Sequence, residues 1–350
     1  MLAIYRRQVT CGSSGTDIKG VKTDNMLSES PIEIGILLYP GGQMAAVLGL
    51  TDLFCVADEL AREKSGDLDT PLLRVSHWQK ESQDKAPARA FDTVPGAAGT
   101  PAVLIIPPAL GDPISRDAAG LYADWLRDSH GAGITLASIC AGALVLGEAG
   151  VLANRMVTTH WGYGDLIQTR FPELAGVETD RLIVDDGDII TAGGVMAWTD
   201  LGLKLVDRFL GPTIMIGTAR HLVIDPPGRE QRYYSTFAPK LMHGDAAVLK
   251  VQHWLQETGA KETSLRALAA QAGLEERTFL RRFQKATDMT TTEYIQRLRV
   301  GKAQELLQFS ASPVDRIAWE VGYANPGAFR KVFTRIVGLT PNAFRRRFHA

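Results

Sequence analysis

Two stretches near the end of the chain share one pattern: SLRALAAQAGLEERTFLRRFQKA at residues 264–286 and PVDRIAWEVGYANPGAFRKVFTRI at residues 313–336. In each, a short amphipathic helix is followed by a glycine turn and a second helix, which carries two phenylalanines one helical turn apart. This order is typical of the helix-turn-helix motif, whose second helix enters the DNA major groove. The repeat therefore predicts two such motifs in tandem, placed to read neighbouring grooves.

The charge of this region favours DNA binding over a helical bundle that only packs. Residues 246–350 contain 17 Lys and Arg against nine Asp and Glu, a net charge of +8. The whole chain has a net charge of −1, so residues 1–245 carry −9. A basic module joined to an acidic one is the electrostatic pattern expected of a nucleic-acid-binding protein.

Helical periodicity assigns the side chains of the two recognition helices to an inner and an outer face. With the phenylalanines inward, the side chains expected to face DNA are Arg277, Leu280, Arg281, Gln284, Gly327, Ala328, Lys331 and Arg335. Arginine can hydrogen-bond guanine, and alanine can contact the thymine methyl group. Arg282 and Arg330 are expected to contact phosphates or to lie on a solvated surface.

A connecting helix is predicted over residues 292–309, between the two motifs. Its length of about 25 Å is compatible with recognition helices spaced by one turn of DNA, about 34 Å. The sequence Ser312-Pro313-x-Asp315 is expected to start the next helix, with proline in the first turn and a capping box.

This segment resembles the AraC-type DNA-binding domain over about 100 residues, and GLTPNAFRRRF at 338–348 is similar to the closing motif of that family. Two departures are mild. Gly301 lies in the connecting helix, where a better helix former would cost less, and Asp288 stands where the family usually has the glycine that Gly338 supplies in the second copy. The resemblance implies double-stranded promoter DNA and RNA polymerase as partners.

The chain before this region alternates short apolar strands with helices. Strands are predicted at 32–38, 72–76, 103–106 and 134–139, and helices at about 45–62 and 115–128. Residues 182–192 are expected to form a hairpin that turns at Asp186-Gly187, and helices at about 196–209 and 213–222 follow. The alternation predicts an α/β domain, a parallel sheet with helices on both faces.

These patterns divide the chain into a disordered N-terminal tail at 1–30, an α/β domain at 31–223, a linker at 224–245 and an all-α domain at 246–350. No apolar run reaches the length of a transmembrane helix, and the first residues lack the apolar core of a signal peptide. Cys11, Cys55 and Cys140 show no paired spacing and no metal-ligand pattern with histidine. We therefore expect a cytoplasmic protein without a metal or other cofactor and without membrane contact.

The α/β domain contains one stretch that suggests chemistry, SICAGA at 138–143. An apolar strand ends at Cys140 and a helix follows at once, flanked by small residues that tolerate a sharp turn, as in a nucleophile elbow. At a helix N-terminus the thiol is expected to favour its thiolate form. His160 follows twenty residues later as an imidazole partner, although Cys140 can equally be a buried structural cysteine.

Around this stretch, GITLASICAGALVLGEAGVLANRMVTTHW at 133–161 and DRLIVDDGDIITAGGVMAWTDLGL at 180–203 resemble the class I glutamine amidotransferase-like (ThiJ/PfpI-like) domain. More narrowly, they are similar to the version fused to AraC-type domains in GlxA-like regulators. The resemblance covers about residues 31–223 and implies a flavodoxin-like fold. It also implies that Cys140 is the elbow cysteine and His160 the neighbouring histidine, and that the chain is a homodimer.

Several departures from catalytic relatives argue against an enzyme. Ala46 stands where those relatives place a glutamate, and Pro107-Pro108-Ala109 stands where they have two glycines that supply oxyanion amides. Pro108 has no N–H to donate. Asp165 and Asp200 are candidates for a third triad member by residue type alone.

Three interpretations remain open. The first is a ligand-responsive transcription regulator whose α/β domain senses a small molecule and dimerises; the resemblance implies a nitrogenous metabolite such as an amino acid or a betaine-like or carnitine-like compound. The second is a cysteine-dependent amidase or hydrolase, and the third a redox regulator that switches through Cys140. Trp161 and Trp198 are candidates for cation–π contact with a ligand. The candidate pocket residues are Cys140, His160, Trp161, Ala46 and Pro108.

Overall fold

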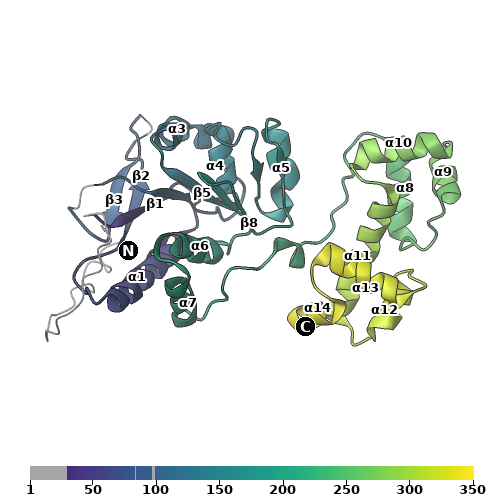
Figure 1. The fold of residues 1–350 in the computed structure, drawn as a ribbon. Helices are drawn as coiled ribbons and strands as arrows, with labels where there is room; N and C mark the ends of the chain where they lie inside the picture. Colours follow the sequence, from purple (N-terminus) through teal and green to yellow (C-terminus); the bar gives the residue numbers. More distant parts are fainter. Residues whose placement is uncertain (1–29, 83, 97–98) are drawn as a thin grey trace.

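The computed structural model describes residues 30–82, 84–96 and 99–350. A sheet domain and a helical domain are joined by an extended segment (Figure 1). Except for Ser30, the N-terminal tail predicted over residues 1–30 lies outside the described residues, as does Cys11. Within the described ranges, no helix has the length and apolar character needed to cross a membrane.

The sheet domain is built on seven strands in the order β3-β2-β1-β4-β5-β9-β8. Their bounds are β1 Ile32–Leu38, β2 Leu73–Gln79, β3 Ala88–Asp92, β4 Val103–Ile106, β5 Thr135–Ile139, β8 Ile183–Asp185 and β9 Ile189–Ala192. The five central strands pair in parallel, and β3 and β8 add antiparallel edges. The order of the central strands, β2-β1-β4-β5-β9, is the flavodoxin-like order, so the predicted fold class is confirmed.

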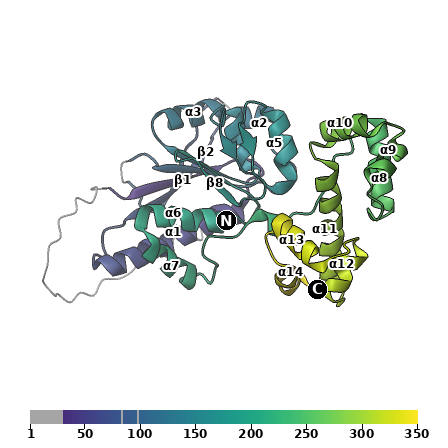
Figure 2. The ribbon, with the colours of Figure 1, turned by 45° about the vertical axis from the view of Figure 1, so that its right-hand side comes forward.

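Helices cover both faces of this sheet (Figures 1 and 2). On one face lie α1 (Met44–Ser65), α6 (Trp198–Leu210) and α7 (Pro212–His221); on the other lie α2 (Arg116–Gly120), α3 (Ala123–Gly131), α4 (Gly142–Glu148) and α5 (Gly164–Arg170). A small two-stranded sheet flanks α5 in the sequence: β6 (Met156–Val157) precedes the helix, and β7 (Gly176–Val177) follows it. The single helix predicted at 115–128 is in fact two, because the chain turns after Gly120 to bury Tyr122 in the core.

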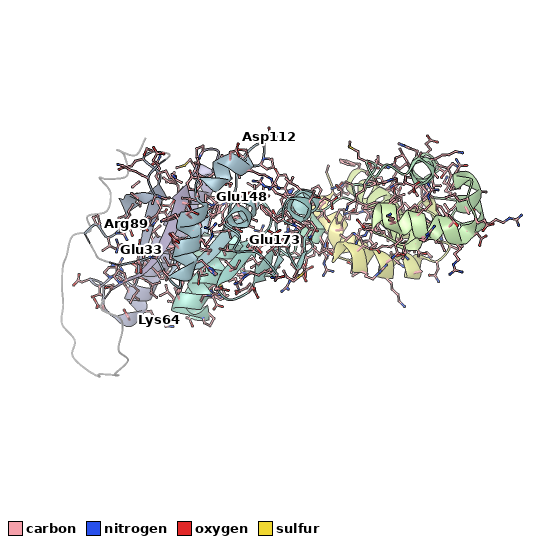
Figure 3. All side chains as sticks on the ribbon, turned by 90° about the horizontal axis from the view of Figure 1, so that it is seen from above. Glu33, Lys64, Arg89, Asp112, Glu148 and Glu173 are labelled. Atoms are coloured by element: carbon pink, nitrogen blue, oxygen red, sulfur yellow. The ribbon has the colours of Figure 1, made fainter. Side chains whose placement is uncertain are left out.

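A buried cluster of charges ties the β3 edge to the rest of the sheet. Glu33 and Arg74 are almost fully buried, Arg89 Nη2 donates to Glu33 Oε2 at 2.8 Å, and Arg74 Nε donates to Asp92 Oδ1 at 3.0 Å. Figure 3 shows Glu33 and Arg89 at the end of the molecule away from the helical domain. Because buried charges are costly unless paired, this cluster fixes the edge of the sheet and takes no part in the sites described below.

The helical domain contains α8 (Ala246–Glu257), α9 (Leu265–Ala272), α10 (Glu276–Thr287), α11 (Thr291–Phe309), α12 (Val314–Glu320), α13 (Pro326–Val337) and α14 (Pro341–Phe348). Two separate apolar cores form, one under α8–α10 and one under α12–α14. The connecting helix α11 contributes Tyr294 and Ile295 to the first and Val300, Ala303 and Leu307 to the second. The predicted tandem arrangement of two helix-turn-helix units about one helix is confirmed.

The start of α12 differs from the prediction. The helix begins at Val314, with Pro313 in the capping position and no side chain capping its N–H groups. Asp315 instead forms an ion pair with Arg330 of α13. The expected capping box is therefore wrong, because the Asp315 carboxylate binds Arg330 of α13 and not an N–H group at the start of α12.

Candidate elbow site and nucleic-acid interface

Cys140 lies at the carboxyl end of β5 in a sharp strand-to-helix turn. Its φ of 54° is left-handed, a conformation that non-glycine residues seldom adopt outside strained sites. Two hydrogen bonds fix it: Cys140 N donates to Ala192 O at 2.7 Å, and Thr159 Oγ1 donates to Cys140 O at 2.8 Å. The elbow expected from the small residues around Cys140 is present.

Gly142 explains why small residues are needed here. A Cβ at this position would lie 2.6 Å from Ile106 O and 2.9 Å from Pro107 O, closer than such atoms approach in folded proteins. The first turn of α4 therefore passes directly over the end of β4. This close approach brings the elbow next to the loop that follows β4.

Burial dominates the chemistry of the Cys140 thiol. The side chain is almost completely buried, and burial raises its pKa to about 11. The backbone N–H groups of Ala141, His160 and Gly194 lie against the sulfur and lower the pKa, but they do not offset burial. The expectation that a helix N-terminus would favour the thiolate is therefore wrong at this site.

The His160 ring is hydrogen-bonded to its own loop. Its Nδ1 accepts from Gly162 N at 3.1 Å, which leaves the ring proton on Nε2, and partial burial lowers its pKa, so the ring is neutral. The ring packs against Trp161 and Tyr163, with ring centroids 5.1 and 5.5 Å apart. Among the described residues, no hydrogen bond joins the imidazole to the Cys140 thiol.

The loops after β1 and β4 meet beside the elbow. Gly42 pairs with Ala109, and Gln43 N donates to Pro108 O at 2.7 Å. Ala46 is fully buried near the start of α1 and brings no carboxylate to this region, and Pro108 brings no N–H. Within the described ranges, no group of three or more His, Cys, Asp and Glu side chains could hold a metal ion.

Gln43 is a polar residue of this region that the sequence analysis missed. It is 7% exposed, and its side-chain oxygen is buried without a hydrogen-bond partner among the described residues. It precedes α1 without capping it. A glutamine in place of a preferred capping residue at a strand-to-helix turn was the available signal.

The remaining candidates of the sheet domain are engaged elsewhere. Asp165 is exposed and forms an ion pair with Lys240, whereas Asp200 is buried and paired with Arg229. Trp198 packs its ring over Gly49 of α1, as a core residue does. Trp161 lines a cavity of about 270 Å³ between the two domains, and the lining of that cavity does not include Cys140 or His160.

The recognition helices are α10 and α13, and their phenylalanines Phe279, Phe283, Phe329 and Phe333 are fully buried. The residues that periodicity placed outward are all exposed, namely Arg277, Leu280, Arg281 and Gln284 on α10 and Gly327, Ala328, Lys331 and Arg335 on α13. Asn325 caps α13 by accepting from Gly327 N at 2.7 Å and Ala328 N at 3.2 Å. That these residues contact DNA stays a prediction.

Three arginines near the recognition faces have partners within the chain. Arg282 donates to both carboxylate oxygens of Asp245, at 2.7 and 2.8 Å, and so ties α10 to the start of α8. Arg330 pairs with Asp315, and Arg335 Nη2 donates to Gln296 Oε1 at 2.6 Å. Arg282 and Arg330 thus have partners that the expectation of a phosphate contact or a solvated surface did not include.

Comparison with known proteins adds names to these two domains. Residues 97–208 match the DJ-1/PfpI family, and residues 268–347 match a helix-turn-helix domain. The transcriptional regulator GlxA of Rhizobium meliloti is 28% identical over 63% of this chain and 68% of its own length. The regulator CdhR of Pseudomonas aeruginosa is 27% identical over 62% of this chain and 65% of its own length. Isonitrile hydratase of Pseudomonas putida, an enzyme by name, is 28% identical over 51% of this chain and 73% of its own length.

Fold, elbow and tandem motifs define a DJ-1/PfpI domain followed by an AraC-type helix-turn-helix domain. The chain spans about two thirds of the length of the two regulators that it resembles. In these two domains and their order it is similar to the GlxA-like regulators, and it is a transcriptional regulator with a helix-turn-helix DNA-binding domain.

Proposed function

We propose that the chain binds specific promoter sequences through α10 and α13, and that residues 31–223 form a sensor that recognises a small metabolite and dimerises. One observation carries the proposal most directly. The helices α10 and α13 each present an exposed basic or small-residue face, and both pack on the single helix α11. Such a pair suits two successive segments of the major groove.

The elbow region supports a sensor. It lies at the carboxyl ends of parallel strands, where open α/β sheets bind their ligands. Cys140, His160, Ala46 and Pro108 come from four different segments that meet there, and the unpaired side-chain oxygen of Gln43 gives a buried hydrogen-bond acceptor nearby. By likeness to its relatives, we propose a nitrogenous metabolite as the effector; Trp161 offers an aromatic face for a cationic group.

The same region argues against catalysis. Cysteine chemistry needs a thiolate and a positioned base, whereas here the thiol is neutral and His160 is bonded to its own loop. We therefore take the resemblance to isonitrile hydratase as a likeness of fold and not of activity. A redox regulator remains a second candidate because three backbone N–H groups surround the sulfur and would donate to oxygens added to it.

The partners follow from this assignment. The basic residues 246–350 bind double-stranded DNA, the sensor takes the effector, and RNA polymerase is the partner through which binding changes transcription. A homodimer is supported by four exposed apolar side chains, Met44, Leu48, Leu110 and Met196. Leu110 N donates to Gly41 O just before α1, and Trp198 of α6 packs on Gly49 of α1. The four residues therefore lie near the N-terminal ends of α1 and α6, and together they are called here the apolar patch. A protein that acts on promoters works in the compartment that holds the chromosome, the cytoplasm of a bacterium.

The test compares two recognition-face residues with a matched neighbour. Arg281→Ala and Lys331→Ala should each weaken binding by about 1–3 kcal/mol to DNA selected by the full chain from a random-sequence pool. Arg282→Ala, whose side chain is held by Asp245, is the control and should change stability more than base preference. Equal losses on selected and random DNA would show that Arg281 and Lys331 contact phosphates only.

A further inference from the structure

The segment after the sheet domain is anchored in it by a buried glutamine. Gln231 is 2% exposed, and its Nε2 donates to Thr159 O at 2.8 Å and to Arg181 O at 3.0 Å. Its Oε1 accepts from Trp161 N at 3.1 Å. A Cβ on Gly193 would lie 1.9 Å from Gln231 Nε2, so the glutamine side chain is closely packed against the Gly193 backbone.

This anchor lies two hydrogen bonds from the elbow. Thr159, whose carbonyl accepts from Gln231, donates its hydroxyl to Cys140 O. Just before the anchor, Arg229 forms an ion pair with the buried Asp200. The chain leaving the sheet domain is therefore fixed to the wall of the proposed sensor site, and any movement of residues 158–161 must displace Gln231.

The residues that follow the anchor contact the end of the second recognition helix. Gly338 ends α13 in a left-handed conformation, and a Cβ there would lie 2.5 Å from Arg232 Nε and 2.7 Å from Tyr233 Cε1. Arg347 of α14 donates to Tyr234 Oη at 2.7 Å and covers the Tyr234 ring at 5.4 Å. This part of the segment thus packs against the backbone that terminates α13.

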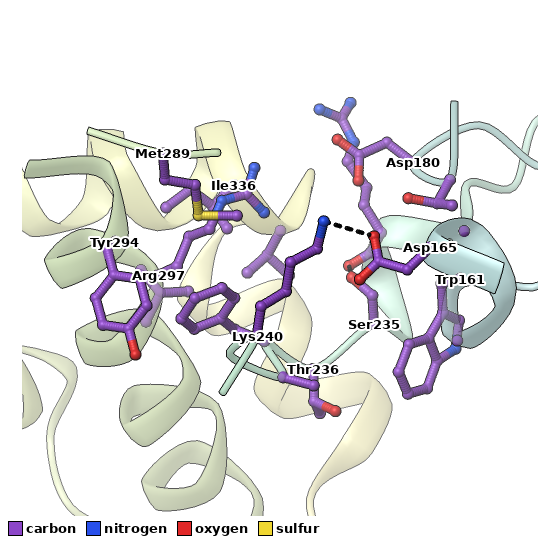
Figure 4. Close-up of a pocket in the computed structure, with 18 of the residues that line it drawn as sticks. Trp161, Asp165, Asp180, Ser235, Thr236, Lys240, Met289, Tyr294, Arg297 and Ile336 are labelled. Carbon is purple, nitrogen blue, oxygen red and sulfur yellow. Dashed lines mark hydrogen bonds and ion pairs between the residues drawn. The ribbon is translucent and has the colours of Figure 1, made fainter. Parts of the chain in front are cut away.

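Lys240 contacts the corresponding end of the first recognition helix. Its Nζ lies 3.0 Å from Oδ2 of Asp288, the residue that ends α10. The same Nζ lies 3.2 Å from Asp165 Oδ1 on α5 of the sheet domain, the pair shown in Figure 4. Asp288 and Gly338 occupy equivalent positions in the two copies. At Asp288 the first helix-turn-helix copy is therefore linked to the sheet domain by the charge of Lys240. At Gly338 the second copy is linked by close packing against its backbone.

We propose that residues 229–240 form a coupling segment, which transmits a change at the elbow to the C-terminal ends of both recognition helices. Its anchor is Gln231, and its two contact points are Arg232 with Tyr233 at Gly338 and Lys240 at Asp288. Because both recognition helices are held at their ends, a shift of the segment changes the angle between them and so the fit to two grooves. The regulatory consequence rests on the proposed sensing function; the physical coupling does not.

The coupling can be measured without DNA or effector, by hydrogen exchange on the full-length chain. Gln231→Ala should raise exchange at the last turns of both α10 and α13 by about tenfold, since these turns lose their support. The small-angle scattering radius of gyration should rise as the domains separate. Gln168→Ala, on the exposed face of α5, is the matched control and should change neither quantity.

A second variant guards against simple misfolding. If Gln231→Ala also loosens strands β5 and β9, Lys240→Ala decides, because that side chain contacts no buried group of the sheet. It should raise exchange at the end of α10 and leave the sheet unchanged, whereas the exposed Lys250→Ala should change nothing. Native exchange at both helix ends in Gln231→Ala, or in Lys240→Ala at α10, would overturn the coupling. Since no DNA is present, that result would leave the DNA-binding proposal standing.

Discussion

At the scale of single residues, Cys140 shows which of two opposing effects decides the state of an elbow thiol. Burial raises its pKa from 9.0 to about 11, and at about 1.4 kcal/mol per tenfold step this favours the neutral thiol by about 3 kcal/mol. A helix N-terminus favours an anion by about 0.3–1 kcal/mol. Burial therefore wins, and the thiol stays protonated at neutral pH.

The neutral thiol makes the stability of the protein depend on pH. The unfolded thiol loses its proton near pH 8.5–9, and the folded one near pH 11. Between these values the folded state holds the extra proton, so stability falls as pH rises. Relative to Cys140→Ala, the wild-type protein should lose stability from pH 9 to 11 in denaturant unfolding. A difference that stays constant with pH would contradict the assignment.

The same neutral thiol bears on the redox candidate. The thiolate, not the neutral thiol, attacks peroxide and iodoacetamide, so peptide mass spectrometry at pH 7 should find Cys140 unmodified after short exposure. A fast reaction of Cys140 at neutral pH that alters DNA binding would favour redox control over ligand sensing.

The close approach of Gly142 to the end of β4 can be tested by substitution. Gly142→Ala places a Cβ against Ile106 O and Pro107 O, and the forced shift should cost the sheet domain about 1–3 kcal/mol of unfolding free energy. Gly301→Ala is the matched control. It lies in α11 with open space around it, so the better helix former should stabilise the helical domain by up to about 1 kcal/mol. Equal effects of the two substitutions would show that the close approach over β4 does not exist.

At the scale of elements, periodicity predicted the helices and strands whose burial follows from their own sequence. It missed those whose position depends on contacts with neighbouring elements. The paired phenylalanines predicted α10 and α13, because they lie one helical turn apart on the buried face of each helix. The apolar runs predicted β1, β4 and β5, because nearly every residue of these strands is buried. Strand β3 was missed since its residues are half-exposed at a sheet edge and are held by the Arg74–Asp92 pair. The break between α2 and α3 depends on where Tyr122 finds space in the core.

The two halves of helix α11 belong to different cores. Leu307→Ala empties space in the core under α12–α14 and should cost about 2–5 kcal/mol there. Hydrogen exchange should rise in α12–α14 and stay native in α9 and α10. Leu268→Ala in the other core should give the mirror result. If either substitution loosens both halves equally, the domain has a single cooperative core.

At the scale of the whole molecule, the chain joins an acidic sheet domain to a basic helical domain, and the charge count alone indicated that division. The sequence did not show that residues 229–240, expected only as a linker, dock on both sides. Gln231 gives no local signal, since a glutamine becomes an anchor only when backbone groups at positions 159, 161 and 181 surround it. The protonation of Cys140 escaped prediction for the same reason: burial is a property of the assembled fold.

The apolar patch is the proposed interface of the homodimer. Met44 is 52% exposed, so Met44→Asp should leave the fold intact and shift the protein from dimer to monomer in analytical ultracentrifugation. A dimer on DNA with two copies of the selected site binds the second copy at high effective concentration, which adds about 10²–10⁴ in affinity. Met44→Asp should lose that gain and keep its affinity for one copy.

Leu68→Asp, which changes an exposed leucine in the loop after α1, is the control and should remain a dimer with full affinity for the paired sites. A Met44→Asp protein that stays dimeric would place the interface elsewhere on the sheet domain. A wild-type protein that is monomeric and binds paired and single sites equally would show that two recognition helices from one chain suffice for the proposed promoter binding.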